Sequence, residues 1–455
     1  MNASARFVII GADAAGMSAA SEARRIDPRL EIVAYDRGGF ASYSQCGLPY
    51  LVGGLVTDQQ RLIARSVEEF AQRGISVRLG HDVTAIDPAR RIVRVRELSS
   101  GVDIEQAYDR LLIATGASPI KPTLPGLDLE CVFQLDVMED ALAIQTYIRE
   151  HQPRRAVIVG GGYIGLEMAE NLVRLGLEVR LVQRATQLFP SIDVDIATHL
   201  GEALERHGVD LSLRNSVVQA CEGQHWRVVD VHTNDGDVPA DLVLLAIGTR
   251  PNVELAHVAG ARIGATGVIA VNDHLETNLP GIFAAGDCAE HWHRIMRQPS
   301  WVPLGTTANK QGRIAGRNAA GGNETFAGIV GTAITRVFDL SVARTGLTER
   351  EAHAAGIACA TTTLTSTDYA GYLPDAQPLT LKLVAEQGTG RVLGGQIVGR
   401  RGVDKRIDVL ATALYSGLTI NDVTRLDLEY APPFNSVWDP IQVAATALLR
   451  RGIMG

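Results

Sequence analysis

Two glycine-rich turns, about 150 residues apart, constrain the fold of this chain more than any other feature. They lie in "RFVIIGADAAGMSAASEARR" and "RRAVIVGGGYIGLEMAENLVRLG", each between an apolar strand and an amphipathic helix. A strand–turn–helix unit of this kind offers the N-terminus of its helix to the phosphates of a dinucleotide. The duplication therefore predicts an α/β chain with two Rossmann-like dinucleotide-binding domains.

The order of the remaining segments predicts that one of these domains is inserted in the other. The second unit continues through "EVRLVQR", a helix at about 195–207 and "DLVLLAIGTRPN", whereas "GIFAAGDCAEHW" and "TTANKQGRIAGRNAAGG" should rejoin the first domain. From about residue 326, strands joined by "QGTG" and a helix at 404–417 indicate a third, α+β domain. We expect a first domain at 1–120 and 246–325, a second at 121–245 and a third at 326–455.

Charge and hydropathy exclude several classes of partner. The formal net charge of −8 leaves no broad basic surface, which argues against nucleic acid and anionic membranes. No apolar run approaches the roughly 18 residues that a membrane span requires. The N-terminus resembles a signal peptide, but Asp13 and the strand–turn–helix pattern argue against one, so we expect a cytoplasmic protein.

The chain has five cysteines, an odd number without any C-x-x-C pair. Neither a disulfide framework nor a metal site is indicated by this spacing. A redox-active cysteine in this chain must therefore act alone or with an external thiol.

The first turn is a dinucleotide fingerprint with one departure. Gly11 permits a tight bend, Gly16 permits close helix–strand packing, and Asp36 follows 25 residues after Gly11, where an acid accepts a ribose hydroxyl. Asp13 replaces the middle glycine. An ordinary tight turn is the alternative interpretation.

The second turn is complete, with Gly160, Gly162 and Gly165 at the expected spacing. Gln183 stands where an acid would bind the ribose of NAD. Arg184 follows, and it either pairs with the 2′-phosphate of NADP or is a surface arginine. NADH and NADPH both remain open.

The candidate redox residue is Cys46, in "SYSQCGLPYLVGG" at 42–54. Pro49 suits the first turn of a helix, so the sulfur should lie at a helix N-terminus, where the dipole favours the thiolate. The alternative is an inert core cysteine, which we expect for Cys131, Cys221, Cys288 and Cys359.

Two further segments, "YDRLLIATGASP" at 108–119 and "GIFAAGDCAE" at 281–290, resemble motifs of the FAD-dependent pyridine nucleotide-disulfide oxidoreductases. The resemblance spans nearly the whole chain and implies FAD in the first domain, NAD(P)H in the second and a third domain for dimerisation. It implies that Asp287 hydrogen-bonds the flavin ribityl chain and that Tyr163 covers the flavin, with Glu167 nearby. Further cofactor-binding positions implied by it are Ala14, Ala15, Ser42, Val83, Ala114, Thr115, Gly116, Ile164, Gly248 and Ala308.

Around Cys46 the chain resembles a single-cysteine subgroup, the coenzyme A-disulfide reductases and the NAD(P)H-dependent persulfide or polysulfide reductases. In that subgroup the thiolate forms a mixed disulfide with an external thiol. The C-x4-C pair of the glutathione-reductase type is excluded by Ala41 and Leu51. Ala14 stands where NADH peroxidases and water-forming oxidases carry a histidine, which disfavours a peroxidase.

The same resemblance extends to "TDYAGYLPDAQPL" at 367–379 and "DLEYAPPFNSVWDP" at 427–440. It implies that Tyr430, and Tyr372 as a second tyrosine, reach the active site of the partner subunit in a homodimer. Either tyrosine is otherwise a packed interface residue. Trp438 stands where relatives carry a lysine. Arg25 and Ser42 match positions that contact bound coenzyme A.

The resulting hypothesis is an enzyme that passes electrons from NAD(P)H through FAD to a disulfide, with Cys46 and Tyr430 acting on the thiol. Three alternatives remain. The chain is an NAD(P)H oxidase in which Cys46 cycles through a sulfenic acid, a reductase of a small iron-sulfur carrier in which Cys46 is dispensable, or a non-enzymatic flavin-bearing sensor.

Overall fold

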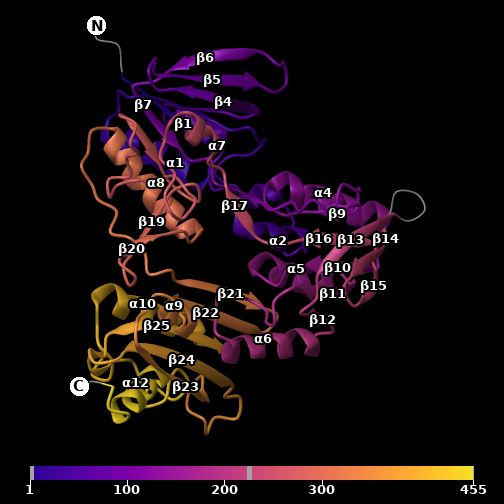
Figure 1. The fold of residues 1–455 in the computed structure, drawn as a ribbon, viewed down its shortest axis with the longest axis vertical. Coiled ribbons are helices and arrows are strands. Elements are labelled where there is room, and N and C mark those ends of the chain that lie inside the picture. Colours follow the sequence, from indigo (N-terminus) through magenta and orange to yellow (C-terminus); the bar gives the residue numbers. More distant parts are fainter. Residues whose placement is uncertain (1–4, 223–227, 454–455) are drawn as a thin grey trace.

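The computed structural model describes residues 5–222 and 228–453, which form three bodies, each built on a five-stranded sheet (Figure 1). The first and second bodies lie beside each other in Figure 1, and the C-terminal body lies below both. Within the described residues, no helix has the length and apolar character that crossing a membrane would require.

The first body holds a parallel sheet in the order β18-β7-β1-β2-β3. Strand β18 comes from a segment about 170 residues after β7, so the chain leaves this body and returns to it. The sheet consists of β1 (Arg6–Ile10), β2 (Glu31–Tyr35), β3 (Ile75–Arg78), β7 (Arg110–Ile113) and β18 (Ile282–Ala284). Helices α1 (Ala14–Ile26), α3 (Val67–Gln72), α7 (Glu254–Val258) and α8 (Gly305–Ala319) accompany it.

Smaller elements complete the first body. They are a meander of β4 (His81–Asp87), β5 (Ile92–Glu97) and β6 (Asp103–Ala107), and a hairpin of β19 (His291–His293) and β20 (Gln298–Ser300). Helices α1 and α8 pack closely because Gly312 and Gly316 lack side chains. A Cβ at either glycine would collide with the carbonyl oxygen of Ala15 or Ala19.

The second body repeats the parallel arrangement in the order β12-β11-β10-β16-β9. Its strands are β9 (Val132–Phe133), β10 (Arg155–Val159), β11 (Glu178–Gln183), β12 (Asp210–Leu213) and β16 (Leu242–Leu245), with helices α4 (Met138–His151), α5 (Tyr163–Arg174) and α6 (Val194–Arg206). A three-stranded antiparallel sheet is added by β13 (Val217–Glu222), β14 (Val228–Thr233) and β15 (Gly236–Pro239). The pair β8 (Ala117–Pro119) and β17 (Thr249–Pro251) links the two bodies.

The C-terminal body is an antiparallel sheet in the order β21-β22-β25-β24-β23. Its elements are β21 (Ala333–Val337), β22 (Leu340–Gly346), α9 (Glu349–Ala354), β23 (Cys359–Thr367), β24 (Pro378–Glu386), β25 (Val392–Gly399), α10 (Val403–Ser416), α11 (Ile420–Val423) and α12 (Pro440–Arg450). The predicted fold class is therefore confirmed, including the insertion and the α+β third domain. The helices expected at 195–207 and 404–417 are α6 and α10.

Three short helices carry the segment around Cys46: η1 (Gln45–Gly47), α2 (Leu48–Val52) and η2 (Gln59–Leu62). Leu48, Leu51 and Val52 of α2 are buried in the same apolar core as α4 and α5 of the second body. At the end of α2, a side chain on Gly53 would collide with Asn171 of α5. Core packing therefore holds the Cys46 segment where the first and second bodies meet.

Candidate active site

The first glycine-rich turn is closed by contacts that only glycine permits. Gly11 has φ +103°, and a Cβ there would collide with the carbonyl oxygen of Ala114. Asp36 lies directly after β2, and its carboxylate accepts the backbone N–H groups of Ala12 at 2.7 Å and Gly38 at 2.8 Å. The predicted acid therefore lies against the predicted turn.

The neighbouring segments bring a second acid to this edge of the sheet. Asp287 follows β18, which pairs with β7, so the two motifs at 108–119 and 281–290 lie side by side. Asp287 Oδ1 is buried and accepts no hydrogen bond from the residues that the structure describes, and burial raises the pKa of this carboxyl to about 6. Since buried polar atoms are normally paired, this oxygen is suited to a hydroxyl of a bound ligand.

These observations fit FAD. The tight turn at Gly11 and Gly16 leaves the N-terminus of α1 open to a pyrophosphate, and the orphan oxygen of Asp287 suits a ribityl hydroxyl. Ala15 and Ala308 are buried on α1 and α8, and Val83 is buried on β4. Thr115 lies where the two bodies join, because its hydroxyl donates to the carbonyl of Asn252 at 2.7 Å. Its neighbours Ala114 and Gly116 flank that link, and Ala14 begins α1.

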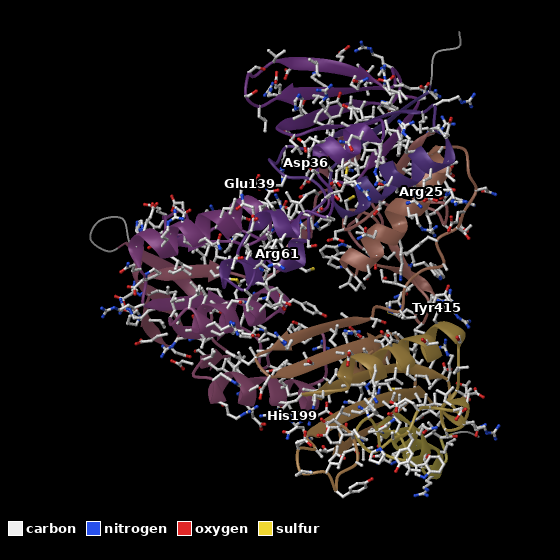
Figure 2. All side chains as sticks on the ribbon, turned by 180° about the vertical axis from the view of Figure 1, so that it is seen from behind. Arg25, Asp36, Arg61, Glu139, His199 and Tyr415 are labelled. Carbon is white, nitrogen blue, oxygen red and sulfur yellow. The ribbon has the colours of Figure 1, made fainter. Side chains whose placement is uncertain are left out.

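Glu139, at the start of α4, is a residue of this region that the sequence reasoning missed. Its carboxylate accepts the N–H of Gly39 at 2.8 Å, so the second body reaches the loop that follows Asp36. Figure 2 shows Asp36 and Glu139 near each other, with Arg25 at the far side of the first body. No local signal marked Glu139, because the contact spans 100 residues.

The second turn repeats the geometry of the first. Gly160 has φ +108°, a Cβ on Gly165 would collide with the carbonyl oxygen of Gly160, and nothing lies within 4 Å of a Cβ on Gly162. Gly248, at φ +106°, begins the return to the first body. Gln183, the last residue of β11, is an amide rather than an acid, and its side chain donates to the carbonyl of Gln187 at 3.2 Å.

Two arginines lie beside Gln183. The backbone N–H of Arg214 donates to the carbonyl of Ala185 at 3.1 Å, which brings the residues after β12 next to those after β11. Arg184 and Arg214 are both exposed, and among the described residues no carboxylate forms an ion pair with either. The sequence reasoning missed Arg214, because strand pairing alone makes it a neighbour of Arg184.

Tyr163 and Glu167 lie on the first turns of α5, followed by the partly buried Ile164. The ring of Tyr163 packs edge-on against Phe189 with 4.5 Å between centroids, and burial raises the pKa of its hydroxyl to about 12. Glu167 Oε1 accepts the hydroxyl of Thr335 at 2.9 Å. Burial raises the pKa of Glu167, although the Thr335 hydrogen bond opposes this. Thr335 belongs to β21, so the C-terminal body touches this site.

Cys46 lies in η1, immediately before α2, with Pro49 in the first turn of that helix as predicted. The residue is exposed and unpaired. The predicted stabilisation of its thiolate is wrong in this structure. Partial burial of the sulfur and the carboxylates of Glu167 and Asp287 raise the pKa of Cys46, and the backbone hydrogen bond that lowers it does not reverse this direction.

The surroundings of Cys46 contain no second thiol at the positions used by two-cysteine reductases. Ala41 and Leu51 are both buried. Cys131 and Cys288 are buried, and Cys359 is half-buried. The side chain of Cys221 lies outside the part of the chain that the structure describes.

The two residues matched to coenzyme A contacts differ in their surroundings. Ser42 has φ +50°, and its N–H donates to the carbonyl of Ala12 at 2.8 Å, so it lies directly beside the first turn. Arg25 is exposed on α1 and forms an ion pair with the buried Glu22 at 2.8 Å. Glu22 also pairs with Arg317 of α8. Arg25 is thus held by an ion pair within α1, and its side chain is nevertheless exposed to solvent.

Tyr372 and Tyr430 are neighbours on the C-terminal body, with exposed fractions of 73% and 49%. Tyr372 lies in the loop between β23 and β24, and Tyr430 in the loop before α12. The elements that flank these loops, β23, β24 and α12, lie at the lower end of Figure 1, whereas α2 lies in the middle. Phe434, Val437 and Trp438 are also exposed and add apolar surface to the same region.

Two family models match successive parts of the chain. The family model described as pyridine nucleotide-disulphide oxidoreductase matches residues 5–312. The model for the dimerisation domain of the same family matches residues 332–440.

Several characterised proteins are similar over nearly the full length. An NAD(P)H coenzyme A polysulfide/persulfide reductase of Pyrococcus horikoshii is 39% identical, over 98% of this chain and 99% of that protein. A coenzyme A disulfide reductase of Staphylococcus aureus is 31% identical, over 96% and 98%. A protein named NADH oxidase from Methanocaldococcus jannaschii is 33% identical, over 98% and 99%.

Solved structures have the same fold. The reduced Bacillus anthracis CoADR-RHD superposes with a TM-score of 0.95 at 35% identity, over 98% of this chain and 80% of that one. An NAD-dependent persulfide reductase from A. fulgidus superposes with a TM-score of 0.94 at 38% identity, over 98% and 83%.

Proposed function

Because the chain belongs to the pyridine nucleotide-disulphide oxidoreductase family, we propose that it reduces a disulfide, persulfide or polysulfide of the coenzyme A type through the single thiol of Cys46. It is an FAD-dependent NAD(P)H:disulfide oxidoreductase. The observation that carries the proposal is the position of Cys46, an exposed thiol held by α2 between two dinucleotide turns.

FAD, when bound, supplies a two-electron carrier between nicotinamide and sulfur. The residues proposed to hold it belong mostly to the first body. The N-terminus of α1 would hold its pyrophosphate, Asp36 would accept ribose hydroxyls, and Asp287 would accept a ribityl hydroxyl. The remaining proposed contacts are Gly11, Ala14, Ala15, Gly16, Ser42, Val83, Ala114, Thr115, Gly116, Gly248 and Ala308.

Cys46 acts on the acceptor by thiol–disulfide exchange. Its thiolate attacks one sulfur of R–S–S–R, so that the bond Cys46–S–S–R forms and one thiolate leaves with the electrons of the broken bond. Tyr430 of a second copy protonates that leaving group. Two electrons from NAD(P)H then cleave the mixed disulfide, which returns the Cys46 thiolate and releases the second thiol.

Replacement of the thiol tests this proposal. Cys46→Ser should retain FAD and lose NAD(P)H-dependent reduction of coenzyme A disulfide by several orders of magnitude, since no other thiol takes its place. Cys359→Ser, at a half-buried free thiol of the C-terminal body, is the matched control and should keep the activity. Full disulfide reduction by Cys46→Ser with normal FAD content would contradict the mechanism.

For the nicotinamide, the proposed contacts are Gly160, Gly162, Ile164 and Gly165 for the pyrophosphate, with Tyr163 and Glu167 next to the flavin. We propose NADPH as the preferred donor, because Gln183 places no carboxylate at the ribose and because Arg184 and Arg214 leave two guanidinium groups free beside it. Arginine pairs readily with a phosphate in two-pronged geometry.

The nucleotide preference is measurable without turnover. Arg184→Ala and Arg214→Ala should each weaken binding of 2′,5′-ADP by about tenfold and leave binding of 5′-ADP unchanged, since a charged hydrogen bond is worth about 1.5–3 kcal/mol. Arg206→Ala, an exposed arginine of α6, is the control. Equal binding of the two nucleotides by the unmodified protein would contradict the preference.

We propose a homodimer in which the exposed tyrosines of one chain reach the thiol of the other. Support comes from the dimerisation-domain match and from the exposed Tyr372, Tyr430, Phe434 and Trp438. Tyr430→Phe should lower disulfide turnover and leave NADPH binding intact. Turnover that survives dilution to a monomer, measured by sedimentation, would contradict the shared site.

A second candidate function is an NAD(P)H oxidase in which Cys46 cycles through a sulfenic acid. The relative named NADH oxidase favours it, and Ala14 in place of a histidine disfavours it. Oxygen uptake in air that matches the rate of disulfide reduction would support the oxidase.

Two smaller proposals complete this assignment. The domain boundaries are 1–120 with 246–325, 121–245 and 326–455. The compartment is the cytoplasm, because Cys46, Cys288 and Cys359 are free thiols, as in a reducing environment.

A further inference from the structure

Asp13, which replaces the middle glycine of the first turn, has a defined partner in the active-site loop. Its Oδ1 accepts the backbone N–H of Tyr43 at 3.1 Å, and Tyr43 lies three residues before Cys46. Asp13 precedes α1 with φ −115°, a value that any residue adopts, so the turn tolerates a side chain here. The departure from the fingerprint therefore creates a contact between two segments about 30 residues apart.

The same two segments share a second bond. The N–H of Ser42 donates to the carbonyl of Ala12 at 2.8 Å, and Ser42 is held in the left-handed region at φ +50°. A serine persists in that conformation only when its surroundings enforce it. Residues 12 and 13 thus hold residues 42 and 43 through one backbone bond and one side-chain bond.

The opposite side of the loop is held by backbone bonds to residues 62–64. The N–H of Ala64 donates to the carbonyl of Ser42 at 2.8 Å, and the N–H of Ser44 donates to the carbonyl of Leu62 at 2.9 Å. The loop that leads to Cys46 is therefore clamped between the first turn and residues 62–64. Among the described residues, Asp13 supplies the side-chain hydrogen bond between the first turn and this loop.

We propose that Asp13 is a positioning residue that ties the cofactor turn to the active-site loop and so sets the pose of Cys46. The inference rests on the proposed role of Cys46 as the reacting thiol. Its consequence is that the first glycine-rich turn, which would hold FAD, and the thiol of Cys46 keep a fixed position relative to each other. A glycine at this position would leave the N–H of Tyr43 without an acceptor and release that side of the loop.

Asp13 also adds negative charge near the thiol. The groups that face it are Asp36 after β2, Asp287 after β18 and Tyr43 of the loop. Burial raises the pKa of Asp13 to about 6, although the N–H groups of Tyr43 and Ala14 oppose this. Near neutral pH the carboxylate is ionised, and it joins burial, Glu167 and Asp287 in raising the pKa of Cys46.

Two variants separate the hydrogen bond from the charge. Asp13→Asn keeps an oxygen that accepts the Tyr43 N–H and removes the charge, whereas Asp13→Gly removes both. Asp87→Gly is the matched control, since Asp87 also accepts a backbone N–H, that of Arg90 at 3.0 Å, but in the turn between β4 and β5, away from the clamp. Each protein is alkylated with iodoacetamide over a range of pH, and labelling of Cys46 is followed by peptide mass spectrometry.

Both Asp13 variants should shift the midpoint of Cys46 ionisation to lower pH by a few tenths of a unit, because a nearby negative charge is lost. At pH values above that midpoint, only Asp13→Gly should raise the limiting rate at which Cys46 is alkylated. The same variant should lower disulfide turnover by roughly tenfold, because the thiol is misplaced. Asp87→Gly should resemble the unmodified protein.

The inference is overturned if Asp13→Gly keeps the limiting alkylation rate and the turnover of the unmodified protein. Should Asp13→Gly fail to retain FAD, the comparison is made between apo-proteins, where an unchanged alkylation rate again overturns it. Alkylation needs no acceptor substrate, so this outcome is independent of whether Cys46→Ser loses disulfide reduction.

Discussion

At the scale of single residues, the chemistry of this protein depends on an exposed thiol among carboxylates. The sulfur of Cys46 is partly shielded, and Glu167, Asp287 and Asp13 all raise its pKa. The thiolate is the reacting form, so by raising the pKa these carboxylates lower the fraction of Cys46 that can react near neutral pH. A positive charge near the sulfur would compensate them.

Removal of the Glu167 charge should activate the thiol. In Glu167→Gln the amide can still accept the Thr335 hydroxyl, so the packing is kept while the charge disappears. We expect alkylation of Cys46 in the apo-protein to begin at lower pH than in the unmodified protein. Glu205→Gln, on the exposed face of α6, is the control. An unchanged pH profile for Glu167→Gln would mean that burial alone sets the pKa.

Asp287 makes the apo-protein less stable as pH rises. Its folded pKa of about 6 exceeds the ordinary value of 3.8, so the folded chain binds the proton more tightly. This contribution to the free energy of unfolding is fully present below about pH 4 and is lost as pH rises through about 6.

Asp287→Asn should therefore raise the thermal midpoint of the apo-protein near pH 7.5, and this effect should shrink progressively as pH falls toward 4. It should also weaken FAD binding, by about tenfold, through loss of a charged acceptor. Asp193→Asn should have the opposite effect on stability near pH 7.5, because hydrogen bonds from Gln396 and Glu349 outweigh burial and lower the pKa of Asp193. Equal signs for the two variants would contradict this account.

At the scale of elements, a buried arginine organises the loops that carry Tyr372 and Tyr430. Arg406 of α10 is 1% exposed and pairs with Asp439 at 2.8 Å. It also donates to Asn435 Oδ1 at 2.8 Å and to the carbonyl of Asp368 at 3.0 Å. One side chain thus holds the segment before Tyr372, at Asp368, and the segment after Tyr430, at Asn435 and Asp439.

Arg406→Ala should cost about 3–5 kcal/mol of unfolding free energy, because Asp439 becomes a buried charge without its cation. Arg400→Ala, which removes an exposed pair with Asp339, should cost at most about 1 kcal/mol. Denaturant unfolding of the two variants measures the difference. Similar costs for both would show that the Asp439 charge is compensated by other groups.

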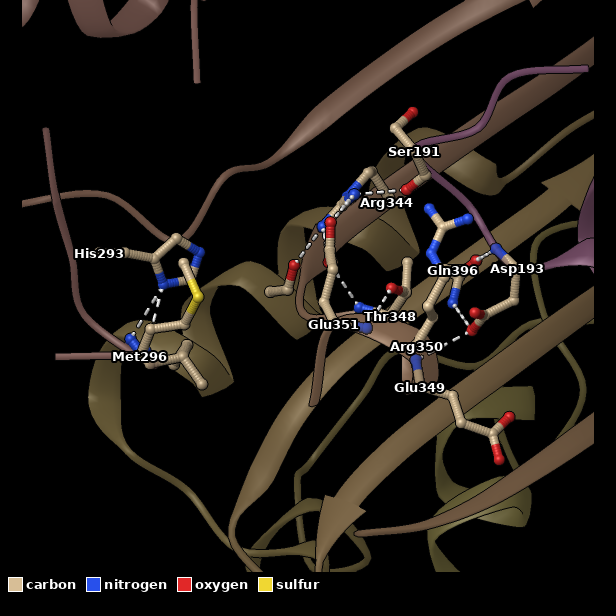
Figure 3. A network of polar contacts seen from close by, with 12 residues as sticks. Ser191, Asp193, His293, Met296, Arg344, Thr348, Glu349, Arg350, Glu351 and Gln396 are labelled. Atoms are coloured by element: carbon tan, nitrogen blue, oxygen red, sulfur yellow. Dashed lines mark hydrogen bonds and ion pairs between the residues drawn. The ribbon is translucent and has the colours of Figure 1, made fainter. Parts of the chain in front are cut away.

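At the scale of the whole molecule, the second and C-terminal bodies are joined by buried polar contacts (Figure 3). Arg344 of β22 pairs with Glu351 at 2.7 Å and donates to the carbonyl of Ser191. Asp193, just before α6, accepts Gln396 of β25 at 2.6 Å. The loop at 190–193 is therefore fastened to the C-terminal sheet, next to Phe189, whose ring contacts Tyr163 of the proposed nicotinamide site.

Lys382 of β24 is the central cation of this junction. It is 5% exposed and pairs with Glu349 at 2.7 Å and with Asp193 and Asp195 at 3.2 Å. Burial opposes its charge, but these carboxylates raise the pKa of Lys382 overall. Lys382→Met should lower the thermal midpoint and expose the 190–195 segment to proteolysis, since three carboxylates lose their partner. Lys310→Met, at an exposed lysine of α8, is the control. Equal proteolysis of the two variants would contradict this role of Lys382.

The sequence by itself determined the architecture. Each glycine-rich turn carries its own strand and helix, so Gly11, Gly16, Gly160 and Gly165 could be located from local pattern and spacing. The order of the segments also predicted the inserted domain and the third, α+β domain. These features depend on steric requirements between residues that are close in the sequence, so they can be predicted from the pattern of residue types along the chain.

Only the tertiary structure decided the environment of each group. Cys46 was correctly placed before a helix, yet the direction of its pKa was predicted wrongly, because Glu167 and Asp287 are separated from it by more than 100 residues. Asp13 looked like a defect in a fingerprint until its partner Tyr43 was known. Electrostatic and hydrogen-bond energies depend on distances between side chains, and those distances follow from packing rather than from spacing along the chain.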